Sequence, residues 1–453
     1  MNLNKFIDVK DNDKEYKYKI LVYPNITYQK DLEKDSYVVV LGNIIRELNK
    51  VRDDLHWTIF SPGGEIKSLV FPNTSQLPIE LPPYPNAMRL HFNQKQIIKQ
   101  IDFRKNDYDI VYSHLPEHTL QLKNLFYNET NIEPKFIGYT HWTEFPEITN
   151  YAMTVMDINF LGLLEMEKCG INTDAQKNLI LHNAKKNFNT DAVIKLSEIL
   201  EPQYLGWEIP KCEKCLEYKP QDKKIIVYNH RPHTYKDYPW FLKQMDELWK
   251  QRQDFVVWVP LSDSITKPYM INEKYDREGY FLKLSSCYIG VCCKQRYGGW
   301  AVSATDGMSV GVPYMFSNDS YYKELAGDAG IYYNDSQTFI ATLNHLLDNK
   351  NERDNWSKKS LLRFENGKWK NAIKPFNNMI NETINNLPTL KSDTDTYKKV
   401  VDFIHKRGSA SKADILNFLN WGVRISFSGY RNRLRKEPTI KFTKDRYEVR
   451  WKN

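Results

Sequence analysis

The first 200 residues alternate short apolar runs with amphipathic stretches, a pattern that predicts a parallel β-sheet with crossover helices. The loops that follow such strands meet at the carboxyl edge of the sheet, where ligands bind in open α/β folds. The expected elements are strands at Tyr18–Tyr23, His56–Phe60, Tyr108–Tyr112 and Lys135–Tyr139, and a helix at Tyr37–Leu48.

A second series of the same kind follows a connector that contains Pro, Cys and Lys, roughly residues 201–223. Two series in succession predict two doubly wound domains, 1–200 and 201–386. The expected elements are strands at Lys224–Tyr228, Phe255–Val259 and Cys287–Cys292, helices at Pro239–Arg252 and Leu361–Asn386, and a linker at Leu387–Thr396.

The end of the chain predicts a small third domain, 395–453, with three helices and a hairpin. A helix at Thr396–Arg407 should end at Gly408, and Ser409 or Ser411 should cap the next helix. The remaining elements are expected at Lys412–Trp421, after Ser426 or Ser428, and as strands Thr439–Phe442 and Tyr447–Trp451 around a turn at Thr443–Arg446.

Positive charge is concentrated in this third domain. Residues 391–453 hold sixteen Lys and Arg against seven Asp and Glu, whereas the whole chain has a net charge of only +8. The preceding 390 residues are therefore close to neutral. Clustered Lys and Arg release counterions from polyphosphate on binding, so the basic end predicts contact with nucleic acid.

The composition excludes several classes of protein. With 41% hydrophobic residues the chain can form ordinary cores, and it contains no apolar run of eighteen residues. Its polar start predicts neither a membrane helix nor a secretory signal. Six cysteines are few for 453 residues and fit a reducing compartment. We expect a protein of the cytoplasm, or of the host cytoplasm if the source is a virus, with no membrane partner.

Two cations follow the first strand of the second domain. Arg231 and Lys236 lie five residues apart on a loop that leads into a helix. An arginine fork and a lysine point charge can together hold a diphosphate. The alternative is that both side chains are simply solvated.

The segment from Asp306 to Pro313, DGMSVGVP, changes this balance. It resembles the second half of the signature of retaining nucleotide-sugar glycosyltransferases with the GT-B fold, in which two Glu are separated by seven residues. Lys323–Leu325 followed by Gly327–Gly330 is similar to the next element of that family. The resemblance implies an α/β fold of two doubly wound Rossmann-like domains, to which the small C-terminal domain is added.

The same resemblance assigns a donor site. Arg231 and Lys236 would hold the diphosphate, and Asp306 would accept hydrogen bonds from the ribose. Gly298 and Gly299 would let backbone N–H groups approach the phosphates. Gly298 stands in the place of the first Glu, which usually contacts the transferred sugar, so the identity of the sugar stays open. The donor would be a UDP-sugar, with UDP-glucose favoured, and neither a metal nor a cofactor is required.

Acidic and histidine side chains follow the strands of the first domain. His141 stands where the family often keeps a histidine against the donor sugar, and His114 and Glu117 follow the preceding strand. We expect these three to be catalytic candidates, although a lone histidine is more often structural. Retaining transfer asks little acid or base chemistry of the protein, because the leaving phosphate can accept the proton.

Three helices and a hairpin resemble a winged helix, in which the third helix enters the major groove and the wing contacts the backbone. The alternative is a basic solvated face or a protein-docking module. The expected DNA contacts are Arg431, Arg433, Arg435 and Lys436 on the third helix, with Lys441, Lys444 and Arg446 on the wing.

Together the parts predict a transferase that glycosylates hydroxymethylated pyrimidines, such as hydroxymethylcytosine, in double-stranded DNA. In logic and fold class the chain resembles the DNA glucosyltransferases of bacteriophages. Two alternatives stay open: a transferase for polysaccharide or protein, and an inactive DNA-binding regulator that senses a nucleotide sugar. A zinc site made by Cys212 and Cys215 with His230 and His233 is a further alternative, although free thiols are favoured.

Overall fold

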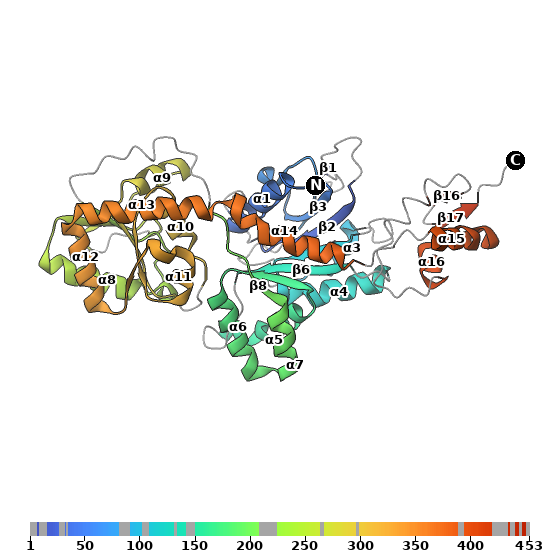
Figure 1. Ribbon diagram of the computed structural model, residues 1–453, viewed down its shortest axis with the longest axis horizontal. Coiled ribbons are helices and arrows are strands. Elements are labelled where there is room, and N and C mark those ends of the chain that lie inside the picture. The colour runs from blue at the N-terminus through green and yellow to red at the C-terminus, as the bar shows by residue number, and fades with distance from the viewer. Residues whose placement is uncertain are drawn as a thin grey trace. The chain divides into compact units, whose positions relative to one another are not determined.

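The structure is a computed structural model, in which contacts divide the chain into two units (Figure 1). Unit 1 comprises Met1–Gly170, Asn187–Leu200 and Pro375–Asn453, and unit 2 comprises Ile171–Lys186 and Glu201–Lys374. The described residues are 7–8, 16–26, 32, 35–80, 91–101, 108–130, 134–141, 150–207, 224–262, 267–295, 299–387, 394–418, 434, 440–443 and 446–449.

The first sheet has eight strands within the described residues, in the order β1-β4-β3-β2-β5-β6-β7-β8. Apart from the edge strand β1, this is the order of a doubly wound α/β sheet, and it reverses direction between β2 and β5. The strands are β1 (Ile7–Asp8), β2 (Tyr18–Tyr23), β3 (Leu55–Pro62), β4 (Thr74–Ile79), β5 (Ile110–Ser113), β6 (Lys135–Thr140), β7 (Lys168–Ile171) and β8 (Leu200–Pro202).

Helices accompany this sheet, and their apolar faces bury its strands. The end of β2 is inaccessible to solvent because the sheet is covered on both faces. One close approach positions the later site: a Cβ on Gly162 of α5 would lie 1.7 Å from the carbonyl oxygen of Pro116, where α4 begins. The helical elements of unit 1 in this part of the chain are α1 (Ser36–Asn49), η2 (Lys67–Leu69), α3 (Gln94–Gln100), α4 (Pro116–Thr130), α5 (Asn150–Leu164) and α7 (Thr190–Ile199). Between them in the chain, α6 (Asp174–Asn187) belongs to unit 2 up to Lys186.

The second sheet has six parallel strands within the described part of unit 2, in the order β11-β10-β9-β12-β13-β14. This is again a doubly wound order, and its reversal lies between β9 and β12. The strands are β9 (Lys224–Val227), β10 (Phe255–Trp258), β11 (Met270–Ile271), β12 (Ile289–Cys292), β13 (Tyr314–Ser317) and β14 (Gly330–Tyr333).

Two hydrophobic clusters cover the two faces of the second sheet. One joins the sheet to α8 and α12, and the other joins it to α9, α10, α11 and α13 (Figure 1). The helical elements are η4 (Thr234–Lys236), α8 (Tyr238–Gln251), α9 (Arg277–Ser285), α10 (Val302–Ser309), α11 (Ser320–Ala326), η5 (Gly327–Ala329), α12 (Ser336–Asp348) and α13 (Lys350–Gly367). The next helix, α14 (Trp369–Asn385), belongs to unit 1 from Pro375 onward.

The C-terminal segment forms its own small core. Its described elements are α15 (Thr394–Arg407), β15 (Ser409–Ser411), α16 (Lys412–Phe418), β16 (Ile440–Thr443) and β17 (Arg446–Val449), and the sheet order is β15-β17-β16. The core residues are Val400, Ile404, Ala410, Ile415, Leu434, Ile440 and Tyr447.

The expected α/β class and the two doubly wound sheets are confirmed. So are the two local signals of the C-terminal segment. Gly408 has φ +75° at the end of α15, and Ser411 caps α16, because its Oγ accepts from Asp414 N while the Asp414 carboxylate accepts from Ser411 N.

Several expected element bounds differ from those of the structure. The single helix Leu361–Asn386 is two helices, α13 and α14, which meet at Lys368. The backbone N–H of Trp207 donates to Gly367 O (2.9 Å), and this contact from elsewhere in the chain coincides with the break. The linker ends earlier than expected, at the start of α15, and the residues at both ends of the expected hairpin turn belong to β16 and β17.

Candidate active site

The loop after β9 is held in one conformation by its own side chains. Tyr228 Oη donates to the carbonyl of Lys236 (2.8 Å), and His233 Nδ1 accepts from Tyr235 N (3.3 Å). Asp237 adopts a left-handed conformation with φ +54°, which turns the chain into α8. The loop therefore presents Arg231, which is exposed, and Lys236 beside the switch point of the second sheet.

Lys236 is a partly buried cation with a neutral partner. Its Nζ donates to Gln295 Oε1, and the amide nitrogen of Gln295 donates to Tyr322 Oη (2.8 Å). Burial lowers the pKa of Lys236 to about 8, the Cys292 thiol opposes this shift, and the positive charge of Arg231 lowers the pKa further. The amine is thus oriented without being neutralised, which suits the binding of an anion.

His230 is a buried, neutral side chain of the same loop. Its Nε2 lies 3.0 Å from Cys292 Sγ, and its Nδ1 lies 2.7 Å from Ser303 Oγ. Burial, with a smaller contribution from Lys236, holds the pKa of His230 well below its usual value. Both histidines of the proposed zinc site are therefore engaged within unit 2.

No metal cluster appears among the residues that the structure describes: no three His, Cys, Asp or Glu side chains are grouped to hold an ion. Cys212 and Cys215 lie outside those residues. Nor does the described chain contain a helix long and apolar enough to cross a membrane.

Asp306 lies in α10, on the same side of the second sheet as α9. The residue is 6% exposed, and Arg277 contacts both of its carboxylate oxygens, with Nη1 3.3 Å from Oδ2 and Nη2 3.4 Å from Oδ1. A carboxylate held in this way can accept hydrogen bonds from two neighbouring hydroxyls.

The glycines of the motif have different surroundings. Among the described residues, nothing lies within 4 Å of where a Cβ on Gly299 would be, and Gly298 lies outside those residues. A Cβ on Gly307 would meet the ring of Tyr314 at 2.3 Å. The Tyr314 hydroxyl donates a hydrogen bond to Asn229 Oδ1 (3.0 Å). Because Asn229 lies two residues before Arg231, the absence of a side chain at Gly307 helps to position the loop.

Glu324, in the next element of the family resemblance, stabilises α6. Its carboxylate accepts from Asp174 N (2.6 Å), Ala175 N (2.8 Å) and Tyr204 Oη (3.2 Å). An anion at a helix N-terminus satisfies unpaired N–H groups and complements the helix dipole. Its role in this chain is structural.

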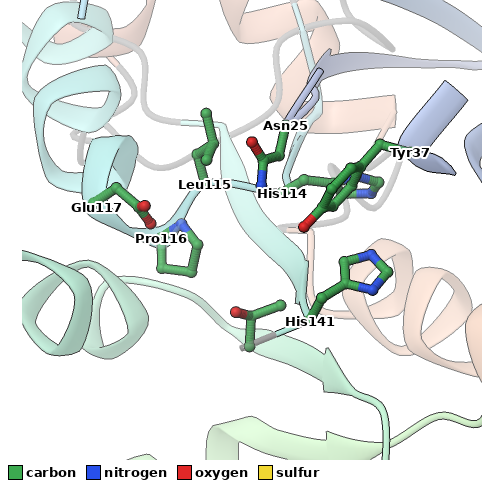
Figure 2. A pocket seen from close by; sticks show the side chains of 8 residues that line it. Asn25, Tyr37, His114, Leu115, Pro116, Glu117 and His141 are labelled. Atoms are coloured by element: carbon green, nitrogen blue, oxygen red, sulfur yellow. The ribbon is translucent and has the colours of Figure 1, made fainter. Parts of the chain in front are cut away.

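Unit 1 has a pocket at the switch point of the first sheet, as Figure 2 shows. It is a small open pocket, formed where β2, β5 and β6 end and where α4 begins. It brings together the three catalytic candidates of the first domain. The lining residues are Asn25, Tyr37, His114, Leu115, Pro116, Glu117, Thr140 and His141.

The two histidines of this pocket are neutral. Burial lowers the pKa of His114 to about 3, and burial together with His114 lowers that of His141 to about 3. His114 is 3% exposed, and neither of its ring nitrogens has a hydrogen-bond partner within the part of the chain that the structure describes. A buried imidazole of this kind normally has a partner, so a ligand hydroxyl is a natural one.

Glu117 and His118 differ in what they do. Glu117 Oε2 accepts from Asn159 Nδ2 (3.0 Å), and the carboxylate stays at the pocket wall (Figure 2). His118 Nδ1 lies 3.0 Å from Tyr23 Oη. Its ring also packs edge-on against Phe92, so the contacts of His118 are part of the packing around the end of β2.

Two of the seven expected DNA contacts can be placed. Lys441 and Arg446 are exposed on β16 and β17, and the Arg446 guanidinium lies 3.7 Å from the Asp414 carboxylate. The other five lie outside the described residues: Arg431, Arg433, Arg435, Lys436 and Lys444.

Several residues of these sites gave no signal in the sequence. Gln295 contacts Lys236 from 59 residues away in the chain, and Arg277 contacts Asp306 from 29 residues away. Neither Gln295 nor Arg277 belongs to a recognisable motif. Asn25 was the most accessible to prediction, because it follows Pro24 at the end of a predicted strand.

No protein-family model matches the chain, and no curated protein sequence does. Solved structures match its fold. Sucrose-phosphate synthase from Thermosynechococcus elongatus has a TM-score of 0.60 at 11% identity, over 81% of this chain and 99% of that one. An E. coli trehalose-6-phosphate protein bound to UDP-2-fluoro glucose has a TM-score of 0.59 at 13% identity, over 80% and 98%. HepE of Anabaena, in complex with UDP and glucose, has a TM-score of 0.57 at 11% identity, over 82% and 100%.

These similarities confirm the expected GT-B fold. At 11–13% identity they show the fold alone. The matched structures are covered almost completely, whereas about a fifth of this chain has no counterpart in them.

Proposed function

We propose that the chain is a retaining glycosyltransferase that moves a sugar from a UDP-sugar, with UDP-glucose favoured, to a hydroxymethylated pyrimidine in double-stranded DNA. The observation that carries this proposal is the loop after β9. This loop presents Arg231 and an oriented Lys236 at the switch point of the second sheet. The buried Asp306 lies on α10, which packs on the same sheet. Two solved structures of the same fold hold UDP with glucose or a fluoro glucose.

The donor site favours departure of the diphosphate. The bond between the sugar C1 and the β-phosphate oxygen breaks with its electron pair on the phosphate, where Arg231 and Lys236 stabilise the negative charge. The acceptor oxygen forms the new bond to C1, and its proton passes to the departing phosphate oxygen. The protein contributes position and charge, which is consistent with neutral histidines in unit 1.

The pocket of unit 1 favours an uncharged acceptor group. Two neutral imidazoles, Asn25 and the Tyr37 side chain can exchange hydrogen bonds with a hydroxyl. The Glu117 carboxylate at its wall would repel a phosphate. A hydroxymethyl group on a base meets these conditions.

The C-terminal segment supports DNA as the carrier of that hydroxyl. Its described elements, a helix, a strand and a helix, then a helical residue at Leu434 and a two-stranded hairpin, are compatible with the element order of a winged helix. Together with the excess of nine positive charges over residues 391–453, this favours nucleic acid over an uncharged polysaccharide.

The test is to incubate the protein with a set of nucleotide sugars and hydroxymethylated DNA, and to weigh the nucleosides after digestion. We expect a hexose-sized mass increase on one modified pyrimidine with UDP-glucose. No increase with any donor, alongside intact DNA binding, would favour the inactive regulator. Transfer to a polysaccharide or a protein but not to DNA would favour the other alternative.

Arg231→Ala tests the donor site separately. It should abolish both transfer and the slow hydrolysis of the donor without acceptor, because the leaving diphosphate loses its bidentate partner. Full turnover by this variant would contradict the diphosphate assignment. Arg252→Ala, which removes an arginine that pairs with Asp254 and Asp348 on the protein surface, is the matched control.

A further inference from the structure

Arg277 faces the carboxylate that we assign to the ribose. It is the first residue of α9, 29 positions before Asp306, and its side chain is 53% exposed. Its two terminal nitrogens lie 3.3 and 3.4 Å from the two different oxygens of Asp306. The guanidinium and the carboxylate therefore meet as two forks, which fixes the plane of the carboxylate as well as its position.

The arginine is itself held in place by aromatic rings. Its guanidinium carbon lies 4.4 Å from the centre of the Phe281 ring and 5.6 Å from that of Tyr280. Such cation–π contacts favour a defined orientation of the side chain, even at a partly exposed site. The orientation of Arg277 is thus set by α9 rather than by Asp306 alone.

Tyr280 connects the pair of Arg277 and Asp306 to the diphosphate loop. Asn229 Nδ2 donates to Tyr280 Oη (2.9 Å) and to Ser303 O (2.7 Å), and Asn229 precedes Arg231 by two residues. Asp306 also acts on this ring, since burial first and then its charge raise the pKa of Tyr280. The pair and the loop belong to one network within unit 2.

We infer that Arg277 positions Asp306 to accept both vicinal hydroxyls of a ribose, so that the pair selects a ribonucleotide donor over a 2′-deoxyribonucleotide. This inference rests on the proposed function and adds the chemical selectivity of its donor site. A carboxylate offers about four acceptor positions, so an arginine fork and a diol can share it. The diol needs both oxygens in one defined plane, and Arg277 supplies that definition.

A shorter side chain makes such a partner more useful. Aspartate at position 306 has one methylene fewer than the glutamate of the resembling family, and it lies in a buried turn of α10. Desolvation of a lone carboxylate is costly, so a buried aspartate also needs a cation. Arg277 could therefore have a purely structural role, in which it only neutralises the buried charge of Asp306. The experiment must separate this role from that of orienting Asp306 for the ribose.

The experiment measures the dissociation constants of UDP and 2′-deoxy-UDP by titration calorimetry for the full-length protein and its variants. The unchanged protein should prefer UDP on the order of tenfold, the value of one charge-assisted hydrogen bond. Arg277→Gln should lose most of that preference, because UDP binding weakens while 2′-deoxy-UDP binding changes less. Arg277→Lys keeps the charge without the fork and should also lose it.

Asp306→Asn completes the comparison. If Arg277 acts through Asp306, the double variant should discriminate no less than the Asp306→Asn single variant does, since the two changes remove one interaction. Arg252→Gln, away from the network, should retain the full preference for UDP. Thermal unfolding of each variant shows whether it is folded at the temperature of the titration.

Three results would overturn the inference. Equal weakening of both nucleotides would mean that Arg277 acts only as a charge near the diphosphate. Tighter UDP binding by Arg277→Gln would mean that the ribose must displace the arginine. An unchanged preference would remove Arg277 from the site. If the unchanged, folded protein binds no UDP, the proposed function itself fails, and this outcome is distinct because it shows in the unchanged protein.

Discussion

Lys236 shows how the surroundings of one residue can set the conditions under which a site binds. Its amine donates to the neutral amide of Gln295, and its pKa is about 8 instead of 10.5 because of burial, with Arg231 adding to the shift. A lysine with this pKa loses its charge within the range of ordinary assays. Its affinity for an anion should therefore depend on pH within that range.

We predict that UDP affinity falls as the pH rises from 7 to 9.5. Bound diphosphate favours the charged amine, so binding takes up a proton above pH 8 and becomes weaker as that proton becomes scarcer. Titration calorimetry in buffers of different ionisation enthalpy measures both quantities. Lys236→Arg is the control, since its guanidinium stays charged and should give a nearly flat profile. The same decline in that variant would contradict the assignment.

The two pocket histidines predict the behaviour of the fold in acid. His114 and His141 have pKa values of about 3 in the folded protein, below the 6.5 of an unfolded chain. Below pH 6.5 the unfolded state binds protons that the folded state refuses, so stability falls as the pH drops from 6.5 towards 3. The slope is about 1.4 kcal/mol per pH unit for each histidine.

Denaturant unfolding at pH 7 and pH 5 measures this loss. His114→Gln should be closer to the unchanged protein at pH 5 than at pH 7, because the glutamine does not titrate. His345→Gln is a suitable control, as that histidine is exposed and bonded to Glu352. If His114→Gln loses as much stability as the unchanged protein between the two pH values, His114 is not the titrating group.

The sequence identifies site residues that lie next to a pattern and misses those that come from elsewhere. Arg231 and Lys236 follow a predicted strand, and Asp306 lies in a motif, so all three were accessible to prediction. Gln295 follows β12, yet an amide in a loop resembles any solvated side chain. Arg277 was inaccessible for a similar reason: its contact with Asp306 depends on how α9 and α10 pack, which no local pattern reports.

At the scale of elements, α10 and β13 meet through a ring set between two glycines. A Cβ on either Gly290 or Gly307 would lie 2.3 Å from atoms of Tyr314. The Tyr314 hydroxyl donates to Asn229, so this packing extends to the diphosphate loop. The motif glycine is therefore needed for its lack of a side chain, and the backbone at this helical position is ordinary.

We predict that Gly307→Ala destabilises the protein by about 1–3 kcal/mol, the usual cost of overpacking a well-packed core. It should also weaken UDP binding, because a displaced ring moves Asn229. Denaturant unfolding and calorimetry measure the two effects. Gly42→Ala, in α1 of unit 1, is the matched control, since a Cβ there would come no closer than 3.4 Å to Leu69 and Ser68. Adding Tyr314→Leu to Gly307→Ala should recover part of the stability, and no recovery would contradict the steric explanation.

The elements that the sequence predicts well are those with a strong local pattern. The strand Tyr18–Tyr23 was predicted with its observed bounds, because its run of apolar residues ends at Pro24. The strand β4 was missed because its sequence, TSQLPI, contains polar residues and a proline. In the structure β4 nevertheless pairs with strands on both sides. The short β15 was also missed, because three small residues carry no periodicity.

At the scale of the whole molecule, positive charge is distributed unevenly along the chain. The neutral 390 residues include both large sheets, and the basic end carries a small core of its own. We expect these two parts to contribute different terms to the reaction. The C-terminal segment would raise the affinity for DNA, and the sheets would bind the donor.

We therefore predict that deleting residues 391–453 lowers turnover on modified double-stranded DNA on the order of tenfold or more at physiological salt, through the loss of phosphate contacts. Donor hydrolysis without DNA should be unchanged, and it serves as the internal control for an intact donor site. The full-length protein should lose turnover steeply as salt is raised, and the deletion variant much less so. Equal turnover of the two at physiological salt would contradict the role of the segment.

The helix α6 has a consequence for how this protein could be divided or recombined. Its residues group with unit 2, and Glu324 of that unit accepts hydrogen bonds at its N-terminus, although α6 comes before the end of unit 1 in the chain. A gene fragment that begins at residue 201 would encode six parallel strands but leave this carboxylate without its helix. Any donor module transplanted between such proteins must therefore bring α6 with it, although Asn187–Leu200 of unit 1 lies between α6 and the rest of unit 2 in the chain.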